Sequence, residues 1–97
     1  MAIKINPDYA DAHYNLGNAL RMEGKNGEAI SHYNTAIELK SDYFMAHNNL
    51  GNALLNNGNT SEAIVHYKRA IELKPDYAQA QKNLETALRS VEVQDLF

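Results

Sequence analysis

The chain has 97 residues, a net charge of −3 and no cysteine. This length fits one small domain, and the lack of cysteine excludes disulfides and thiolate metal sites. The charge is too small to favour a nucleic-acid or acidic membrane partner, and no apolar run approaches the ~18 residues of a membrane span.

One stretch of 34 residues occurs twice in succession, at 10–43 and at 44–77. Aligned without a gap, 21 of the 34 positions are identical. A fixed period of this length indicates stacked structural repeats, each too small to bury its apolar face alone. Residues 1–9 match the end of a preceding repeat and its turn, and 78–97 match the start of a following one. We therefore expect a section of a longer array, with 78–97 as a capping helix and tail.

The first element predicted is a helix that ends near Glu23. Its buried face is predicted from apolar residues at helical spacing: Ala12, Leu16, Ala19 and Leu20. Gly24 follows, and glycine adopts the left-handed conformation that ends many helices at no steric cost. A second helix from Gly27 to Leu39 then returns antiparallel to the first, because the link between them is short.

The second copy repeats this plan, with Gly58 as the stop. Residues 59–62, Asn-Thr-Ser-Glu, then have the pattern of a capping box, in which side chains satisfy the first amides of a helix. A last helix is expected from Asp76 to about Val93, where it covers the open end of the stack.

Glycine recurs inside the first helix of each copy, at Gly17 and Gly51. Glycine inside a helix costs ~1 kcal/mol relative to alanine. That cost indicates a compensating close contact, where a larger side chain would force the helices apart.

These residues resemble the tetratricopeptide repeat over almost the whole chain. Its signature spacing occurs twice: Leu16, Gly17, Leu20, Ala29, Tyr33 and Ala36, then Leu50, Gly51, Leu54, Ala63, Tyr67, Ala70 and Pro75. The chain departs from the pattern at His13 and His47, where the family has a large aromatic residue. The resemblance implies an all-α, right-handed superhelical solenoid of antiparallel helix pairs, with about five helices. It also implies a concave groove, lined by the first helices, that binds an extended peptide or a helix.

The resemblance places the ligand on one stripe of the first helices. The candidate residues are Asp11, Tyr14, Asn15, Asn18 and Arg21, then Met45, Asn48, Asn49 and Asn52, then Gln79, Lys82, Asn83 and Thr86. Asparagine is a poor helix former, but its amide offers two donors and an acceptor to a peptide backbone. Two interpretations stay open: the amides bind a ligand, or they satisfy one another and neighbouring turns. Their recurrence resembles the asparagine ladder of O-linked N-acetylglucosamine transferase arrays, which favours binding.

The charge of this stripe favours a mildly acidic peptide. It carries one acid, Asp11, and three bases: Arg21, Lys82 and Arg89. Relatives that grip a terminal carboxylate need several basic residues at positions that are neutral here: Tyr14, Gln79 and Asn83. We therefore expect that carboxylate clamp to be absent.

The four histidines do not predict a metal site. His13 and His47, like His32 and His66, are one repeat apart, which would separate them by ~10 Å, too far for one zinc ion. No catalytic set, phosphate-binding loop or basic face is evident either. We therefore expect no enzyme activity, no cofactor and no nucleic-acid partner.

Two functions remain. The first is a peptide-binding adaptor or scaffold with a protein or peptide partner, which we expect in the cytoplasm. The alternative is self-association, since an uncovered apolar end of the stack tends to find a partner. Stacking on another copy, or exchange of the terminal helix, would give a homo-oligomer.

Overall fold

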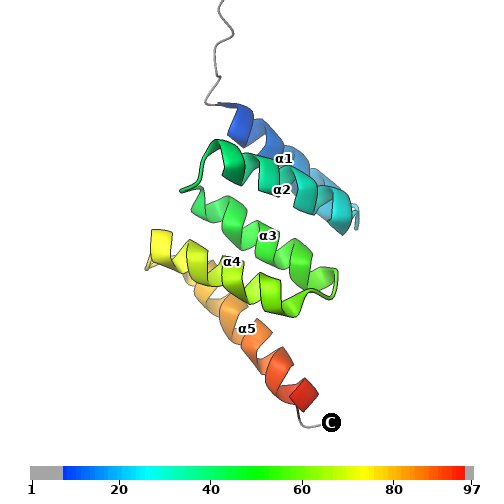
Figure 1. The fold of residues 1–97 in the computed structure, drawn as a ribbon, viewed down its shortest axis with the longest axis vertical. Helices are drawn as coiled ribbons and strands as arrows, with labels where there is room; N and C mark the ends of the chain where they lie inside the picture. The colour runs from blue at the N-terminus through cyan, green and yellow to red at the C-terminus, as the bar shows by residue number, and fades with distance from the viewer. Residues whose placement is uncertain (1–7, 96–97) are drawn as a thin grey trace, which may run out of the picture.

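The computed structural model describes residues 8–95, which form five α-helices and no strand (Figure 1). In chain order the helices are α1 (Asp8–Met22), α2 (Asn26–Leu39), α3 (Phe44–Asn56), α4 (Thr60–Leu73) and α5 (Ala78–Asp95). α1 packs on α2 and α3 on α4 within each repeat, while α2 packs on α3 and α4 on α5 between repeats. α3 also contacts α1 and α5, so these three first helices form one layer, against which α2 and α4 pack. The predicted all-α solenoid is confirmed, and none of these five helices is long and apolar enough to cross a membrane.

The predicted glycine stops are confirmed in both repeats. Gly24 has φ 81° and Gly58 has φ 86°, both in the left-handed region. The Gly24 amide donates to the Arg21 oxygen at 3.0 Å, and the Lys25 amide donates to the Leu20 oxygen at 2.9 Å. This pair of bonds is the Schellman motif, which satisfies the last carbonyl groups of a helix and turns the chain back.

The predicted capping box at residues 59–62 does not form. Asn59 makes no side-chain hydrogen bond to the start of α4, and Lys25 makes none to the start of α2. The preceding turn explains why the second bond of the box is missing, because the Asn59 amide already donates to the Leu54 oxygen at 2.8 Å and is not available to Glu62. The two repeats therefore do not differ by a side-chain cap.

A tyrosine ring fills the space between the two helices of each repeat. The rings of Tyr33 and Tyr67 are fully buried. A Cβ on Gly17 would lie 2.7 Å from Tyr33 Cε1, and a Cβ on Gly51 would lie 2.5 Å from Tyr67 Cε1. Such distances are well inside van der Waals contact, so these rings are the close contact that the two glycines permit.

The first repeat exposes a face that is buried in the second. Leu50 is 1% exposed in a cluster with residues of α2, whereas its equivalent Leu16 is 45% exposed. Ala12 and Ala19 are also exposed, although their equivalents one repeat later are fully buried. Of the four residues predicted to form the buried face of this helix, only Leu20 is partly buried. The reason is that no helix among residues 8–95 covers α1 as α2 covers α3.

Candidate functional site

Two buried tyrosines each orient one asparagine on the layer formed by α1, α3 and α5. The Tyr33 hydroxyl donates to Asn18 Oδ1, and the Tyr67 hydroxyl donates to Asn52 Oδ1 at 2.6 Å. Both rings are fully buried, whereas both asparagines are only partly buried. Because the oxygen of each amide faces its tyrosine, the Nδ2 group lies on the opposite side of the amide and can donate away from the core.

A second set of hydrogen bonds links the three first helices. Asn49 Nδ2 on α3 donates to Asn18 Oδ1 at 2.8 Å and to the Tyr14 hydroxyl at 3.0 Å, both on α1. Asn83 Nδ2 on α5 donates to Asn48 Oδ1 at 3.0 Å. Some of the asparagines on the predicted stripe therefore bind one another, which is the alternative that the sequence left open.

The asparagines differ in what they can still offer a ligand. Asn48 is 1% exposed and donates to Asn49 Oδ1 at 3.3 Å. Asn49 has both amide hydrogens in use, on Asn18 and Tyr14. By contrast, the Nδ2 groups of Asn18 and Asn52 have no acceptor among residues 8–95. Asn18 and Asn52, one repeat apart, therefore each keep a free amide donor, as does the exposed Asn15.

The other predicted residues are exposed around these amides. They are Asp11, Asn15, Met45, Gln79, Lys82 and Thr86. The Tyr43 hydroxyl donates to Asp11 Oδ1 at 2.6 Å, and the Tyr77 hydroxyl donates to Gln79 Oε1 at 3.2 Å. Tyrosine hydroxyls thus also hold the polar groups at the starts of α1 and α5.

Arg21 brings a positive charge to the tyrosine–asparagine pairs. Its partly buried side chain donates from Nε to the Tyr33 hydroxyl at 3.3 Å. Burial raises the pKa of Tyr33 and raises the pKa of Tyr67 to about 12, while the Arg21 charge acts against both shifts. The guanidinium therefore lies beside the Tyr33–Asn18 pair, and its charge also acts on Tyr67 of the second repeat.

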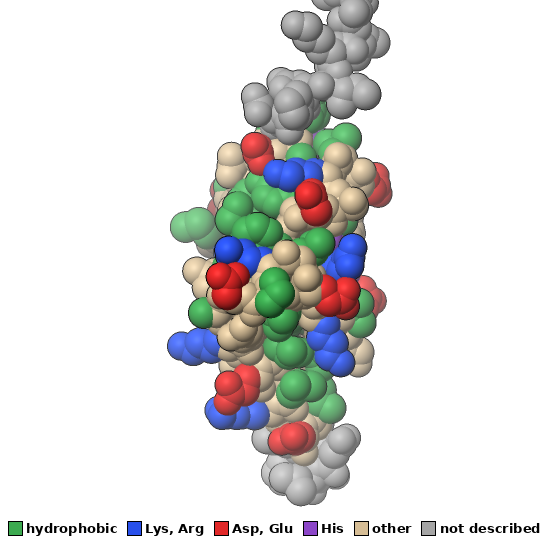
Figure 2. All heavy atoms as spheres, turned by 90° about the vertical axis from the view of Figure 1, so that its left-hand side faces the viewer, with side chains coloured by type: hydrophobic (Ala, Val, Ile, Leu, Met, Phe, Trp, Pro, Cys, Tyr) green, Lys and Arg blue, Asp and Glu red, His purple; other side chains and the backbone are tan. Residues whose placement is uncertain are grey.

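The remaining surface charges are mixed in sign. Arg89, which the sequence counts as a base of the stripe, forms an ion pair with Glu85 one turn earlier. Figure 2 shows acidic and basic side chains interspersed with hydrophobic ones on the face that it draws. The predicted preference for an acidic ligand would therefore depend mainly on Arg21 and Lys82.

The histidines form two pairs that the sequence did not reveal. His13 Nδ1 lies 3.0 Å from His32 Nδ1, and His47 Nδ1 lies 3.1 Å from His66 Nδ1. Each partner is on the other helix of the same repeat, not one repeat away. The available signal was the equal 19-residue separation of both pairs across a helix–turn–helix hairpin. In residues 8–95 no three histidine or acidic side chains gather to hold a metal ion.

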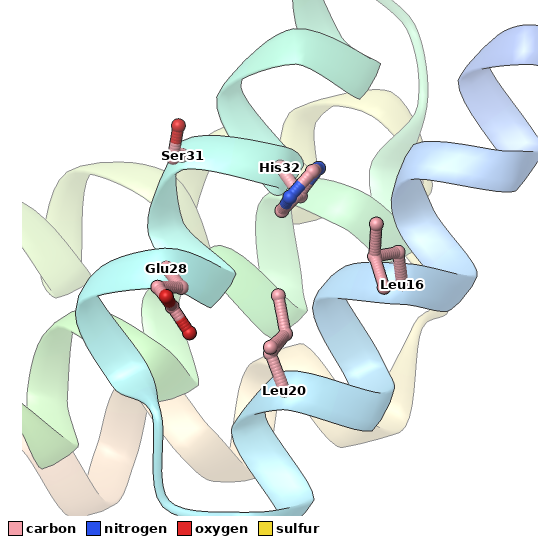
Figure 3. A pocket seen from close by; sticks show the side chains of 5 residues that line it. All are labelled: Leu16, Leu20, Glu28, Ser31 and His32. Atoms are coloured by element: carbon pink, nitrogen blue, oxygen red, sulfur yellow. The ribbon is translucent and has the colours of Figure 1, made fainter.

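A pocket lies on the uncovered face of the first repeat (Figure 3). It is lined by Leu16 and Leu20 of α1 and by Glu28, Ser31 and His32 of α2. Figure 3 shows the two leucine side chains extending from α1 toward α2. In the second repeat Leu50 and Leu54, the equivalents of these leucines, are buried, so the pocket is the open form of a packing surface.

Two family models match the chain. One described as "TPR repeat" matches residues 1–22 and 17–58, and one described as "Tetratricopeptide repeat" matches residues 44–77. The chain belongs to the tetratricopeptide repeat (TPR) family. The signature residues that predicted this family therefore identified it correctly. A search of curated proteins finds no match to the chain.

Two solved TPR structures are similar over nearly all of this chain. The second TPR of Spaghetti (RPAP3), bound to the HSP90 peptide SRMEEVD, is 26% identical, with a TM-score of 0.87 over 93% of this chain and 83% of that one. The MamA protein is 28% identical, with a TM-score of 0.84 over 94% of this chain and 50% of that one. The TPR chain described here thus spans about half of the MamA structure.

Proposed function

We propose that the layer of first helices binds an extended peptide and that the protein is a non-catalytic interaction module. The observation that carries this proposal is the pair of donors on Asn18 and Asn52, which Tyr33 and Tyr67 orient away from the core. Donors repeated along one face suit the carbonyl oxygens of an extended peptide, whatever its side chains. The peptide bound to the RPAP3 relative supports this class of ligand.

The proposed binding mode does not depend on a terminal carboxylate. Tyr14 is bonded to Asn49, and Asn83 to Asn48, so neutral contacts occupy two positions where a carboxylate clamp would need cations. Arg21 lies beside the Tyr33–Asn18 pair and can pair with an acidic side chain within a peptide. We therefore expect the peptide SRMEEVD to bind weakly, and internal acidic residues to contribute more than a C terminus.

Peptide display followed by calorimetry tests this proposal. Peptides are first selected by display on the parent chain. Their affinities are then measured for the parent, for the double variant Asn18→Ala with Asn52→Ala, and for Asn34→Ala, which removes an exposed amide on α2. Two hydrogen bonds at ~0.5–1.5 kcal/mol each predict about 5- to 150-fold weaker binding by the double variant. We expect no change with Asn34→Ala. Equal binding by all three chains would refute the role of the two amides.

Self-association is a second candidate function, favoured by the uncovered face of α1. A helix of a second copy laid on this face would bury Leu16 as the core of the chain buries Leu50. Light scattering after gel filtration should then show a mass that rises with concentration, and Leu16→Lys should restore the monomer. Val65→Lys, at an aliphatic side chain 62% exposed on α4, is the matched control. A monomer throughout the micromolar range removes this candidate.

A further inference from the structure

The His13–His32 and His47–His66 pairs, each bridged between two Nδ1 atoms, have the same geometry. The ring centres are 5.3 Å apart in the His13–His32 pair and 5.4 Å apart in the His47–His66 pair, and the planes are inclined by 23° in each. The Nδ1 atoms are 3.0 and 3.1 Å apart. In each pair the distance between the ring centres exceeds the distance between the Nδ1 atoms by twice the distance from the centre of an imidazole ring to one of its atoms. The Nδ1 atoms therefore lie near the line between the ring centres, and the rings meet edge to edge through a hydrogen bond.

This geometry suits a proton rather than a metal ion. Zinc ligands lie ~2.0–2.1 Å from the ion and converge on it from tetrahedral directions. An ion on the line between two facing nitrogens would need them about 4 Å apart. The observed separations of 3.0 and 3.1 Å are too short, and residues 8–95 supply no third ligand. The two nitrogens of each pair therefore share one hydrogen.

A backbone carbonyl determines which histidine donates and which accepts in the His47–His66 hydrogen bond. His47 Nε2 lies 3.3 Å from the Ser41 oxygen, which can only accept, so Nε2 carries the hydrogen and His47 Nδ1 is the acceptor. His66 Nδ1 is then the donor, and His66 Nε2 keeps a lone pair. A first added proton binds His66 Nε2 without disturbing the bridge. A second can bind only His47 Nδ1, where it places two N–H donors face to face.

We propose that each histidine pair is a latch between the two helices of its repeat, and that the second latch, His47–His66, is acid-sensitive: it holds with one added proton and opens with the second. The latch is a property of the fold, and it does not depend on what the first-helix layer binds. Opening the second latch weakens the contact between α3 and α4. The Tyr67–Asn52 hydrogen bond joins the same two helices, so the same event releases the amide that Tyr67 orients.

The surroundings of the second latch fix the order of the two steps. Burial lowers the pKa of both His47 and His66. Glu62 on α4 partly offsets this for His66. For His47 the hydrogen bond to the Ser41 carbonyl raises the pKa, and the positive charges of His66 and Arg69 on α4 lower it again. His66 therefore takes the first proton and His47 resists the second. Because both values lie below that of an unfolded imidazole, about 6.5, the latch stabilises the fold fully above that pH and less as the pH falls.

The first latch is more open to solvent. His13 and His32 are partly buried, and His32 lines the pocket of Figure 3 together with Glu28. Tyr9, on α1, places its ring centre 5.9 Å from that of His13. His47 in the second latch is only 6% exposed. We therefore expect the second latch to dominate the response to acid.

Nitrogen-15 NMR of the histidine side chains tests the proposal on the whole chain. At neutral pH we expect a scalar coupling between Nδ1 of His47 and Nδ1 of His66, with hydrogen on Nε2 of His47. On acidification His66 Nε2 should titrate first with the coupling intact. The coupling should vanish in the second step, together with shifts of backbone amides where α3 meets α4. No coupling at neutral pH, or one step in which both rings titrate like free imidazoles, overturns the latch.

Neutral replacements isolate the acid response. Asparagine places an amide atom near the former Nδ1 position, so His47→Asn with His66→Asn retains a hydrogen bond that cannot titrate. The urea midpoint of the parent should fall between neutral pH and about pH 5, and that of the double variant should fall less than half as far. The matched change His13→Asn with His32→Asn should keep most of the fall. Equal falls in all three chains contradict the latch. If the His47→Asn, His66→Asn variant does not fold, the scalar coupling between the two Nδ1 atoms of the parent chain decides whether the latch exists.

Discussion

Replacement of Gly51 by alanine probes the packing inside each repeat. A Cβ at this position would lie 2.5 Å from Cε1 and 2.7 Å from Cδ1 of Tyr67. The Tyr67 ring is fully buried, and its hydroxyl donates to Asn52 at 2.6 Å. The ring therefore cannot move aside without giving up both its packing and this hydrogen bond.

Three terms set the size of the Gly51→Ala effect. Overpacking a core costs ~1–3 kcal/mol, and loss of the Tyr67–Asn52 bond adds ~0.5–1.5 kcal/mol. The better helix propensity of alanine returns ~1 kcal/mol. The net loss in the free energy of unfolding is about 2 kcal/mol, which lowers Tm by roughly 8–16 °C in a domain of this size. Gly17→Ala should have the same sign but a smaller effect, because its nearest contact with Tyr33 is 2.7 Å.

Urea unfolding followed by the helical circular dichroism signal measures this loss. Gly27→Ala is the matched control, since a Cβ at this position in α2 would have no neighbour within 4 Å. Alanine at Gly27 should raise the free energy of unfolding by up to ~1 kcal/mol. A Gly51→Ala chain at least as stable as the parent would refute the view that the tyrosine ring requires glycine.

Three further predictions use the same unfolding assay. Gly24→Ala should lower stability by ~1–2 kcal/mol, because an alanine would be forced to φ 81°; an unchanged midpoint would contradict this. Asn48→Ala should lower it by ~1–3 kcal/mol by leaving the Asn83 amide without its partner, and a neutral result would show that the bond contributes little. Because burial raises the pKa of Tyr67 to about 12, the unfolded chain loses this proton first, so stability should fall as the pH rises above 10; Tyr67→Phe should remove part of that fall, and an equal fall in both chains would contradict it.

The repeat period predicted most of the fold because the same local features recur in both copies. Gly24 and Gly58 end their helices as the sequence indicates, since a left-handed residue is a local requirement. Burial is not local. Leu16 and Leu50 lie in the same Asn-Leu-Gly-Asn-Ala-Leu segment of their repeats, yet they differ from 45% to 1% exposure. The reason is that α2 packs over α3, whereas no helix among residues 8–95 packs over α1 in the same way.

The site could be predicted only in outline. Helical spacing predicted that the asparagines share the layer of first helices, because that depends on the period alone. The spacing predicted Tyr33 and Tyr67 only as core residues. It could not show that their hydroxyls orient Asn18 and Asn52. The histidine pairs were missed for a related reason: contacts between the two helices of a hairpin depend on how the helices are rotated about their axes, which the period does not specify.

The most direct test of peptide binding at the first-helix layer is NMR mapping of the asparagine side chains. The nitrogen-15-labelled chain is titrated with a peptide selected by display. We predict that the side-chain NH₂ signals of Asn18 and Asn52 shift with the amount of bound peptide, while that of Asn34 on α2 stays unchanged. Shifts confined to α2 and α4, with Asn18 and Asn52 unaffected, would contradict the proposed function.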